Sequence, residues 1–262
     1  MRYNERQPTD RCLSGLKVRH NKLLVGCLFC LSVMSGFAQN KIPAIDMVLV
    51  KGGIFLMKPA GMPDNEPERI KVADFHIGRY EVTQAQWTAV MGKNPSKVKG
   101  DSLPVTNVDW MDVKAFIKRL NGKTGKKYRL PTDVEWEYAA RGGKLSKGYR
   151  YSGSNNVVDV SWNVFNSDKR VHKTGTKKPN ELGIYDMSGN VWEICEWSKF
   201  DDFYSDEMNL LMTGGPTAEV RRGGSFMNIH NMFFADHISS GVSPDYYENK
   251  PDVGFRLALN AK

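Results

Sequence analysis

Two short stretches of this sequence carry side chains whose types and spacing could do chemistry. Residues 223–234 read Gly-Gly-Ser-Phe-Met-Asn-Ile-His-Asn-Met-Phe-Phe, so a Gly-Gly-Ser turn leads into a run that mixes polar and apolar residues. Residues 186–193 read Asp-Met-Ser-Gly-Asn-Val-Trp-Glu, with a carboxylate at each end. The first stretch has no nucleophile beside an evident base. The second offers the carboxylate and carbonyl oxygens that a hard cation prefers.

The residues after the Gly-Gly-Ser turn include types that bind copper. They are two methionines and two histidines, namely Met227, Met232, His230 and His237. Both residue types ligate copper, but their spacing fixes no geometry. The interpretation that we favour is that the methionines pack and the histidines are solvated.

The composition is that of a globular protein, and the net charge does not indicate a nucleic-acid binder. The chain has 262 residues, of which 40% are hydrophobic and 25% charged, with a formal net charge of +8. Residues 1–38 hold six of the Lys and Arg residues and two acids, so half of the excess charge lies there. The rest is spread along the chain, whereas a nucleic-acid binder clusters its charge on one face or helix.

The first 38 residues resemble a signal peptide with a short upstream extension. The basic stretch KVRHNK precedes the apolar run LLVGCLFCLSVM, and small residues lead to Ala38. About twenty apolar residues are needed to span a bilayer comfortably, so we predict cleavage after Ala38 and export to the periplasm, envelope or medium. An uncleaved leader that acts as a short membrane anchor is the alternative. Cleavage leaves Cys195 as the one cysteine, which we expect to be a small buried hydrophobe.

The remaining residues, 42–262, predict one α+β domain without an internal linker or repeat. We expect a hairpin over 47–57 and a strand over 75–80. Capping residues and helical periodicity predict three helices: one from Thr83 to Gly92, one from Asp109 to Gly122, and one from Thr132 to Gly142, with Glu135 and Glu137 facing water or a loop. From residue 148 onward we expect loops and short strands. Loops this long are uncommon unless a ligand, an ion or a polar network orders them.

Six stretches, in order along the chain, resemble the formylglycine-generating (sulfatase-modifying factor) enzyme family. They are YEVTQAQWTAVM, PVTNVDWMDVKAFIKRL, YRLPTDVEWEYAARGG, TKKPNELGIYDMSGNVWEICEW, VRRGGSF and VGFRLAL. The resemblance runs from about Met47 to Leu259. It implies a single compact domain of low regularity, related to C-type-lectin-like domains.

The resemblance also implies a calcium site in DMSGNVWE. The ligands carried over are the side chains of Asp186 and Glu193 and the backbone carbonyls of Gly189 and Val191. Carboxylate and carbonyl oxygens suit Ca²⁺. A β-turn with two solvated acids is the alternative.

The chemistry of the family does not carry over in the same way. Its enzymes oxidise a substrate cysteine with O₂, using two copper-binding cysteines, the first three residues after the Gly-Gly-Ser turn and the second five further on. Those positions hold Asn228 and Phe233 here, and neither side chain can form the thiolate that soft copper selects. We therefore assign no catalytic residue and do not expect bound copper.

We expect the C-terminal loop to bind a ligand instead. Its candidate contacts combine aromatic and hydrogen-bonding side chains, a mixture that suits surface recognition: Asn228, His230, Asp236, Tyr246 and Tyr247. The function that we favour is an exported module that binds a protein or glycan in the envelope, or that assists assembly there. The alternatives are an oxidoreductase that converts protein cysteine to formylglycine with an unconventional metal site, and a structural part of an envelope complex.

Overall fold

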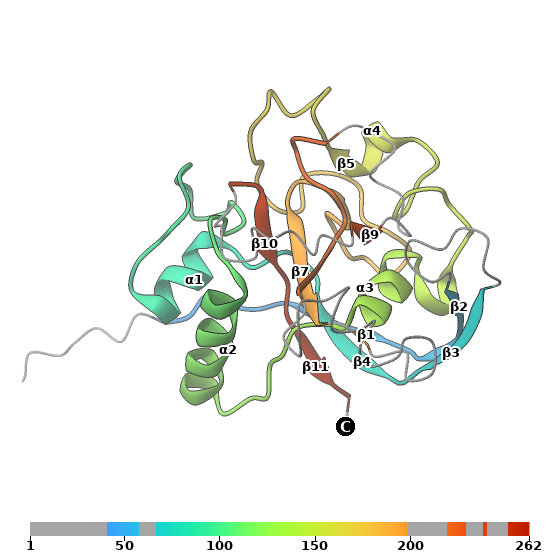
Figure 1. Ribbon diagram of the computed structural model, residues 1–262, viewed down its shortest axis with the longest axis horizontal. Coiled ribbons are helices and arrows are strands. Elements are labelled where there is room, and N and C mark those ends of the chain that lie inside the picture. Colours follow the sequence, from blue (N-terminus) through green and yellow to red (C-terminus); the bar gives the residue numbers. More distant parts are fainter. Residues whose placement is uncertain are drawn as a thin grey trace, which may run out of the picture. The chain divides into compact units, whose positions relative to one another are not determined.

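The protein is an α+β domain built from short helices, several small sheets and long connections (Figure 1). The computed structural model describes residues 41–57, 67–196, 198, 219–228, 238–239 and 251–261. The helical segments in these ranges are α1 (Gln84–Met91), α2 (Trp110–Thr124), α3 (Asp133–Ala140), the 3₁₀ turn η1 (Gly143–Leu145) and α4 (Val157–Val160). Across these ranges no helix is both long enough and apolar enough to cross a membrane.

The strands form two main sheets and two smaller ones. The strands are β1 (Met47–Val50), β2 (Gly53–Met57), β3 (Glu68–Val72), β4 (Phe75–Gly78), β5 (Ser161–Trp162), β6 (Ser188–Gly189), β7 (Trp192–Glu196), β8 (Glu219–Arg222), β9 (Ile238–Ser239), β10 (Val253–Phe255) and β11 (Ala258–Asn260). The strand orders are β1-β4-β11, β10-β7-β8-β9, β2-β3 and β5-β6. The C-terminal segment supplies a strand to each main sheet, because β10 pairs parallel with β7 and β11 pairs antiparallel with β4.

The three predicted helices are present, and their N-terminal caps are those read from the sequence. Thr83, Asp109 and Thr132 each accept a hydrogen bond from the backbone of the third helical residue, and each helix has a complete capping box. The predicted end of α2 was wrong. Gly122 lies inside the helix, and Gly125 closes it with a φ of 68°, because only a residue that tolerates the left-handed region can end a helix in this way.

The predicted hairpin over 47–57 was also wrong. β1 pairs with β4, whereas β2 pairs with β3. Gly52 passes so close to the neighbouring chain that a Cβ there would lie 2.2 Å from the carbonyl oxygen of Val72. Its N–H donates to Asp74 Oδ1 at 2.9 Å. The Lys-Gly-Gly segment therefore carries the chain from one sheet to the next.

The core has two main hydrophobic clusters. One lies around α1 and α2, where Trp87 stacks on Phe116 at 5.0 Å and Phe255 meets both rings edge-on. The other lies between α3 and strands β1 to β4. Offset-stacked and edge-to-face rings are the favoured arrangements of aromatic pairs, so the first cluster fixes α1 and α2 against β10.

One helix face differs from the expectation. Glu137 in α3 was expected to face water or a loop, but it is buried and accepts a hydrogen bond from Arg222 at 2.9 Å. Arg141 binds its other oxygen at 2.9 Å. A buried carboxylate is stable only when paired, and the partner here comes from a strand 85 residues further along the chain.

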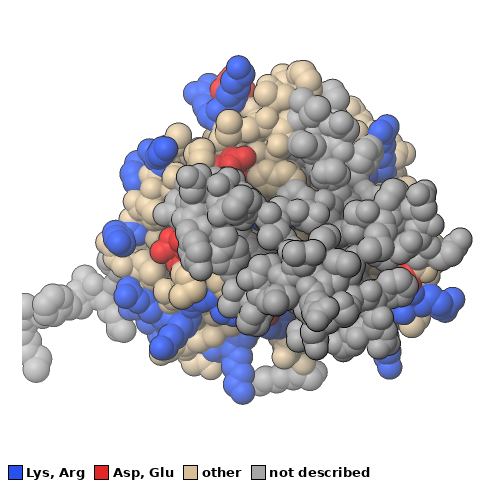
Figure 2. All heavy atoms as spheres, in the orientation of Figure 1, with Lys and Arg blue, Asp and Glu red and all other residues tan. Residues whose placement is uncertain are grey.

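Positive charge is distributed over the surface. On the face drawn in Figure 2, the Lys and Arg side chains lie at several separate places and do not form one continuous block. The sequence had suggested the same dispersed pattern.

Candidate functional site

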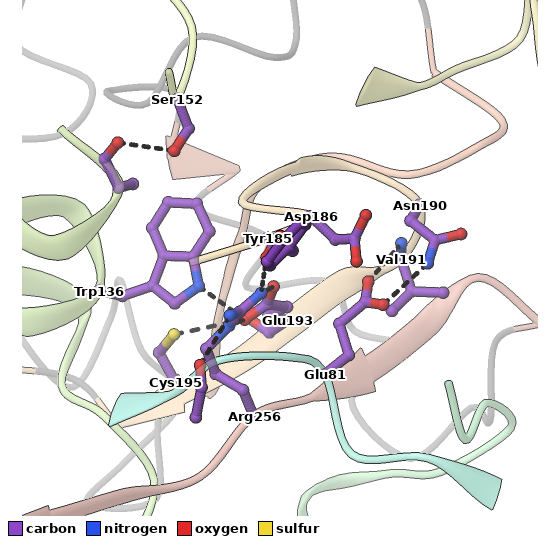
Figure 3. A network of polar contacts seen from close by, with 12 residues as sticks. Glu81, Trp136, Ser152, Tyr185, Asp186, Asn190, Val191, Glu193, Cys195 and Arg256 are labelled. Atoms are coloured by element: carbon purple, nitrogen blue, oxygen red, sulfur yellow. Dashed lines mark hydrogen bonds and ion pairs between the residues drawn. The ribbon is translucent and has the colours of Figure 1, made fainter. Parts of the chain in front are cut away.

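A buried carboxylate lies at the centre of the polar interior. Glu193 on β7 accepts two hydrogen bonds from Arg256, one to each oxygen and both at 2.5 Å (Figure 3). Trp136 Nε1 of α3 donates to the same carboxylate at 2.7 Å. None of the three side chains is exposed. This two-pronged geometry is the strong form of the arginine–carboxylate pair.

Arg256 also holds two segments that are distant in sequence. Its Nη1 donates to the carbonyl oxygen of Gly78 at the end of β4, and its Nη2 donates to that of Tyr185, each at 3.0 Å. The residue lies between β10 and β11, where the chain passes from one main sheet to the other. One guanidinium thus connects both main sheets with the loop that precedes the DMSGNVWE stretch.

Two further carboxyl groups lie in this interior. Glu81 accepts hydrogen bonds from Asn190 Nδ2 at 2.8 Å and from the Val191 N–H at 3.2 Å. Asp186 Oδ2 accepts from the Gly175 N–H at 2.6 Å, whereas its buried Oδ1 has no hydrogen-bond partner. The carboxyl groups of Glu81 and Asp186 point toward one another in Figure 3.

Burial and nearby charges change the acidity of these two carboxyl groups. Burial, reinforced by the nearby charges of Asp186 and Glu193, raises the pKa of Glu81 well above its ordinary range. Burial also raises the pKa of Asp186 from 3.8 to about 6, although the hydrogen bond from Gly175 and the charge of Arg256 act in the opposite direction. The charge of Arg256 lowers the pKa of both acids, but its guanidinium is bound to Glu193 and burial remains the larger effect.

The four residues predicted to hold calcium lie along one short segment but have different surroundings. Asp186 and Glu193 are both buried, and the latter is occupied on both oxygens by Arg256. The Gly189 N–H donates to the carbonyl oxygen of Gly223, and the Val191 N–H donates to Glu81. Within the described ranges no three His, Cys, Asp or Glu side chains are arranged to hold a metal ion. Of the two predicted carboxylates, Asp186 is the one with an oxygen that has no hydrogen-bond partner. Calcium binding stays a prediction.

The Gly-Gly-Ser turn rests on the same segment. Its Gly223 carbonyl accepts from the Gly189 N–H at 2.8 Å, and the Phe226 N–H donates to the Asn190 carbonyl at 2.8 Å. Since the Asn190 side chain binds Glu81, the turn is anchored to the polar interior.

Asn228 closes this turn. Its Oδ1 accepts hydrogen bonds from the Ser225 N–H at 2.8 Å and from the Ser225 hydroxyl at 2.9 Å. The same hydroxyl lies 2.7 Å from Asp252 Oδ2, and the Asn228 carbonyl accepts from the Val164 N–H at 3.1 Å. The sequence suggested a ligand contact at Asn228; its side-chain oxygen holds the turn, and its role as a ligand contact stays a prediction. The flanking Met227, expected to pack, is 53% exposed.

The other predicted residues of the loop lie outside the described residues. They are His230, Met232, Phe233, Asp236, His237, Tyr246 and Tyr247. The assignment of His230, Asp236, Tyr246 and Tyr247 as ligand contacts stays a prediction. So do the packing of Met232, the solvation of the histidines and the assignment of Phe233 as the second cysteine position.

Cys195 was expected to be a small buried hydrophobe, and this is confirmed. It is fully buried in β7, and its Sγ lies 3.6 Å from the Glu193 carbonyl oxygen. Burial raises the pKa of its thiol well above the ordinary value, and the charge of Glu193 adds to this effect. The thiolate is the reactive and metal-binding form of cysteine, so Cys195 is not suited to chemistry.

Sequence reasoning missed three members of the interior network: Glu81, Trp136 and Arg256. Two of them had a signal, because Glu81 lies between Tyr80 and Val82 and Arg256 lies between Phe255 and Leu257. A charge inside an apolar, strand-like run indicates burial with a partner. The identity of that partner could not be read from the sequence.

The chain belongs to the sulfatase-modifying factor enzyme 1-like domain family, whose model matches residues 33–261. Solved structures with the same fold include Treponema denticola variable protein 1, which is 28% identical with a TM-score of 0.67 over 84% of this chain and 98% of that one. PvdO from Pseudomonas aeruginosa has a TM-score of 0.63 at 23% identity, over 85% of this chain and 97% of that one. The α+β fold expected from the sequence is thereby confirmed.

Among individual proteins, the chain is similar to a chaperone protein, LppX, of Paenibacillus barcinonensis. The two are 34% identical over 78% of this chain and 91% of the relative. The chain is also 34% identical to the formylglycine-generating enzyme of Thermomonospora curvata, over 56% of this chain and 52% of that enzyme. It therefore spans about half of the latter's length.

The raised pKa of Asp186 predicts an inverse dependence of stability on pH. The folded state binds this proton more tightly than the unfolded chain does, so the stabilisation is complete below pH 4 and is lost as the pH rises through about 6. We expect the free energy of unfolding, measured with urea in the presence of a chelator, to decline by up to about 3 kcal/mol from this group.

Asp186→Asn is the matched variant. The backbone φ of Asp186 is 57°, and Asn also tolerates this left-handed region. The variant should flatten the slope between pH 4 and 7 and be more stable than the wild type at pH 8. An equally steep slope in both proteins would show that Asp186 titrates normally.

Calcium bound to the Asp186 carboxylate would stabilise the fold at high pH, where loss of the proton from Asp186 destabilises it. At pH 8, where Asp186 is ionised, a hundredfold excess of Ca²⁺ over its Kd should stabilise the fold by about 2.7 kcal/mol. The melting temperature should therefore rise in the wild type and stay constant in Asp186→Asn, with Mg²⁺ as the ion control. No rise in the wild type, or the same rise in both proteins, would count against the site.

Proposed function

We propose that this chain is an exported binding or assembly module that keeps the frame of its family and does not oxidise cysteine. One observation carries the proposal. At the position where the family resemblance places the first catalytic cysteine, Asn228 uses its side-chain oxygen to hold Ser225. A group committed to closing the turn, and unable to form a thiolate, cannot provide the copper ligand that the oxidation needs.

The rest of the described site agrees with this proposal. Cys195 is buried, and burial raises the pKa of its thiol. The turn is nevertheless rigidly supported, since Gly223 and Phe226 are bonded to the segment that contains Gly189 and Asn190. A rigid scaffold that presents a loop is a common way to build a recognition surface.

One relative supports a role in assembly. A protein that resembles this chain over 91% of its own length is named a chaperone, and a role in assisting another protein suits a domain without the oxidase chemistry. The leader over residues 1–38 supports export, so the partner that we propose is a protein or glycan of the envelope. His230, Asp236, Tyr246 and Tyr247 are its proposed contacts.

The test of chemistry uses the purified protein with Cu(I), reductant, O₂ and a peptide that carries a sulfatase-type cysteine. No aldehyde should form above background, while the Thermomonospora curvata enzyme assayed in parallel should produce it. Aldehyde formation by this chain would restore the oxidoreductase alternative.

The test of binding uses a photo-crosslinking amino acid at Met227, beside the turn, in cells that export the protein. A defined adduct should form there and not from the matched position Met111, which is 61% exposed on α2. Adducts from neither position, or from both equally, would contradict a binding surface at the turn.

A further inference from the structure

The β2–β3 ribbon has an outer face that the rest of the described structure does not cover. The two strands pair antiparallel, with Ile54 opposite Lys71 and Leu56 opposite Arg69. Because side chains alternate along a strand, these four share one face of the ribbon. We call them the ribbon face.

The opposite face of the ribbon is fixed to the core. Met57 and Val72 are buried, and the Phe55 ring meets Tyr138 of α3 edge-on at 5.6 Å. The Tyr138 hydroxyl donates to the carbonyl oxygen of Lys51, just before β2. In Figure 1 the ribbon lies beside α3 at the right-hand edge of the drawn domain. The ribbon face is thereby held in a defined orientation, away from α3.

The ribbon face exposes two aliphatic side chains next to two cations. Ile54 is 57% exposed and Leu56 is 58% exposed. Arg69 and Lys71 are exposed as well, and neither makes a hydrogen bond or ion pair with the described residues.

The positive charges of Arg69 and Lys71 favour a membrane surface over a second copy of this chain as the occupant of the ribbon face. A strand with exposed aliphatic residues invites pairing with another chain, and charged residues at such edges discourage it. A second copy of this chain would bring Arg69 and Lys71 close to like charges, which disfavours self-association. An apolar row beside a cationic row instead matches a bilayer surface, where phosphates lie directly above the acyl chains.

We propose that the ribbon face docks on a membrane surface that contains anionic lipid. The guanidinium of Arg69 and the ammonium of Lys71 bind headgroup phosphates, while Ile54 and Leu56 enter the boundary between headgroups and acyl chains. This contact differs from the sequence expectation, in which only an uncleaved leader would touch a membrane. It does not depend on the turn at Asn228, so it can fail while the proposed function stands.

The test is cosedimentation of the full chain with vesicles at low ionic strength. One vesicle set is pure phosphatidylcholine, and the other is equal parts phosphatidylcholine and phosphatidylglycerol. The full chain is used throughout, so that any contribution of the leader is common to every variant. We expect partition to favour the anionic vesicles and to weaken as salt is added.

Two double variants separate the two components of the contact. Arg69→Gln with Lys71→Gln should weaken partition to anionic vesicles roughly thirtyfold, because each cation near such a surface raises the partition coefficient about fivefold. Ile54→Thr with Leu56→Thr keeps strand-forming residues and should weaken partition roughly tenfold. Lys118→Gln with Arg119→Gln on α2 removes the same charge from another exposed site and should leave partition unchanged.

Three results would overturn the proposal. The first is equal partition of the wild type to both vesicle sets. The second is an equal loss in the α2 control, which would show an effect of net charge alone. The third is concentration-dependent self-association in solution that Ile54→Thr with Leu56→Thr abolishes, which would make a second copy the occupant. Circular dichroism and melting temperature establish that each variant is folded.

Discussion

The buried pair of Glu193 and Arg256 is the interaction on which the rest of the structure depends. Arg256 reaches the end of β4 and the carbonyl of Tyr185, while Glu193 receives the indole N–H of Trp136 from α3. Removing two charges from water is costly, and only two-pronged geometry with further hydrogen bonds offsets that cost. Here those further bonds connect both main sheets, a helix and a loop, so breaking the pair would affect every layer of the domain.

The network also explains how a domain with so little regular structure can present a turn in a fixed position. Asn190 binds Glu81 through its side chain and Phe226 through its carbonyl, so the interior extends directly to the Gly-Gly-Ser turn. Asn228 then closes that turn on Ser225. The ribbon face lies on a separate part of the domain and is positioned by Tyr138.

The sequence predicted local features well and long-range pairings poorly. The capping boxes at Thr83, Asp109 and Thr132 depend on residues three positions apart, so they could be read directly. The hairpin over 47–57 was wrong because strand pairing depends on segments that periodicity cannot place. The partner of Glu193 was missed for the same reason, because Arg256 lies 63 residues away. The DMSGNVWE pattern singled out Asp186 and Glu193, but neither their burial nor the guanidinium bound to Glu193 could be read from it.

A double-mutant cycle on the buried pair tests the central claim most directly. The free energy of unfolding is measured by urea titration for the wild type, Glu193→Leu, Arg256→Met and the double variant. Each single change leaves one buried charge without its partner and should cost roughly 3–5 kcal/mol, whereas the double change removes both charges and should cost clearly less than the sum. Single effects that are small, or that add to the effect of the double variant, would contradict a structure organised around this pair.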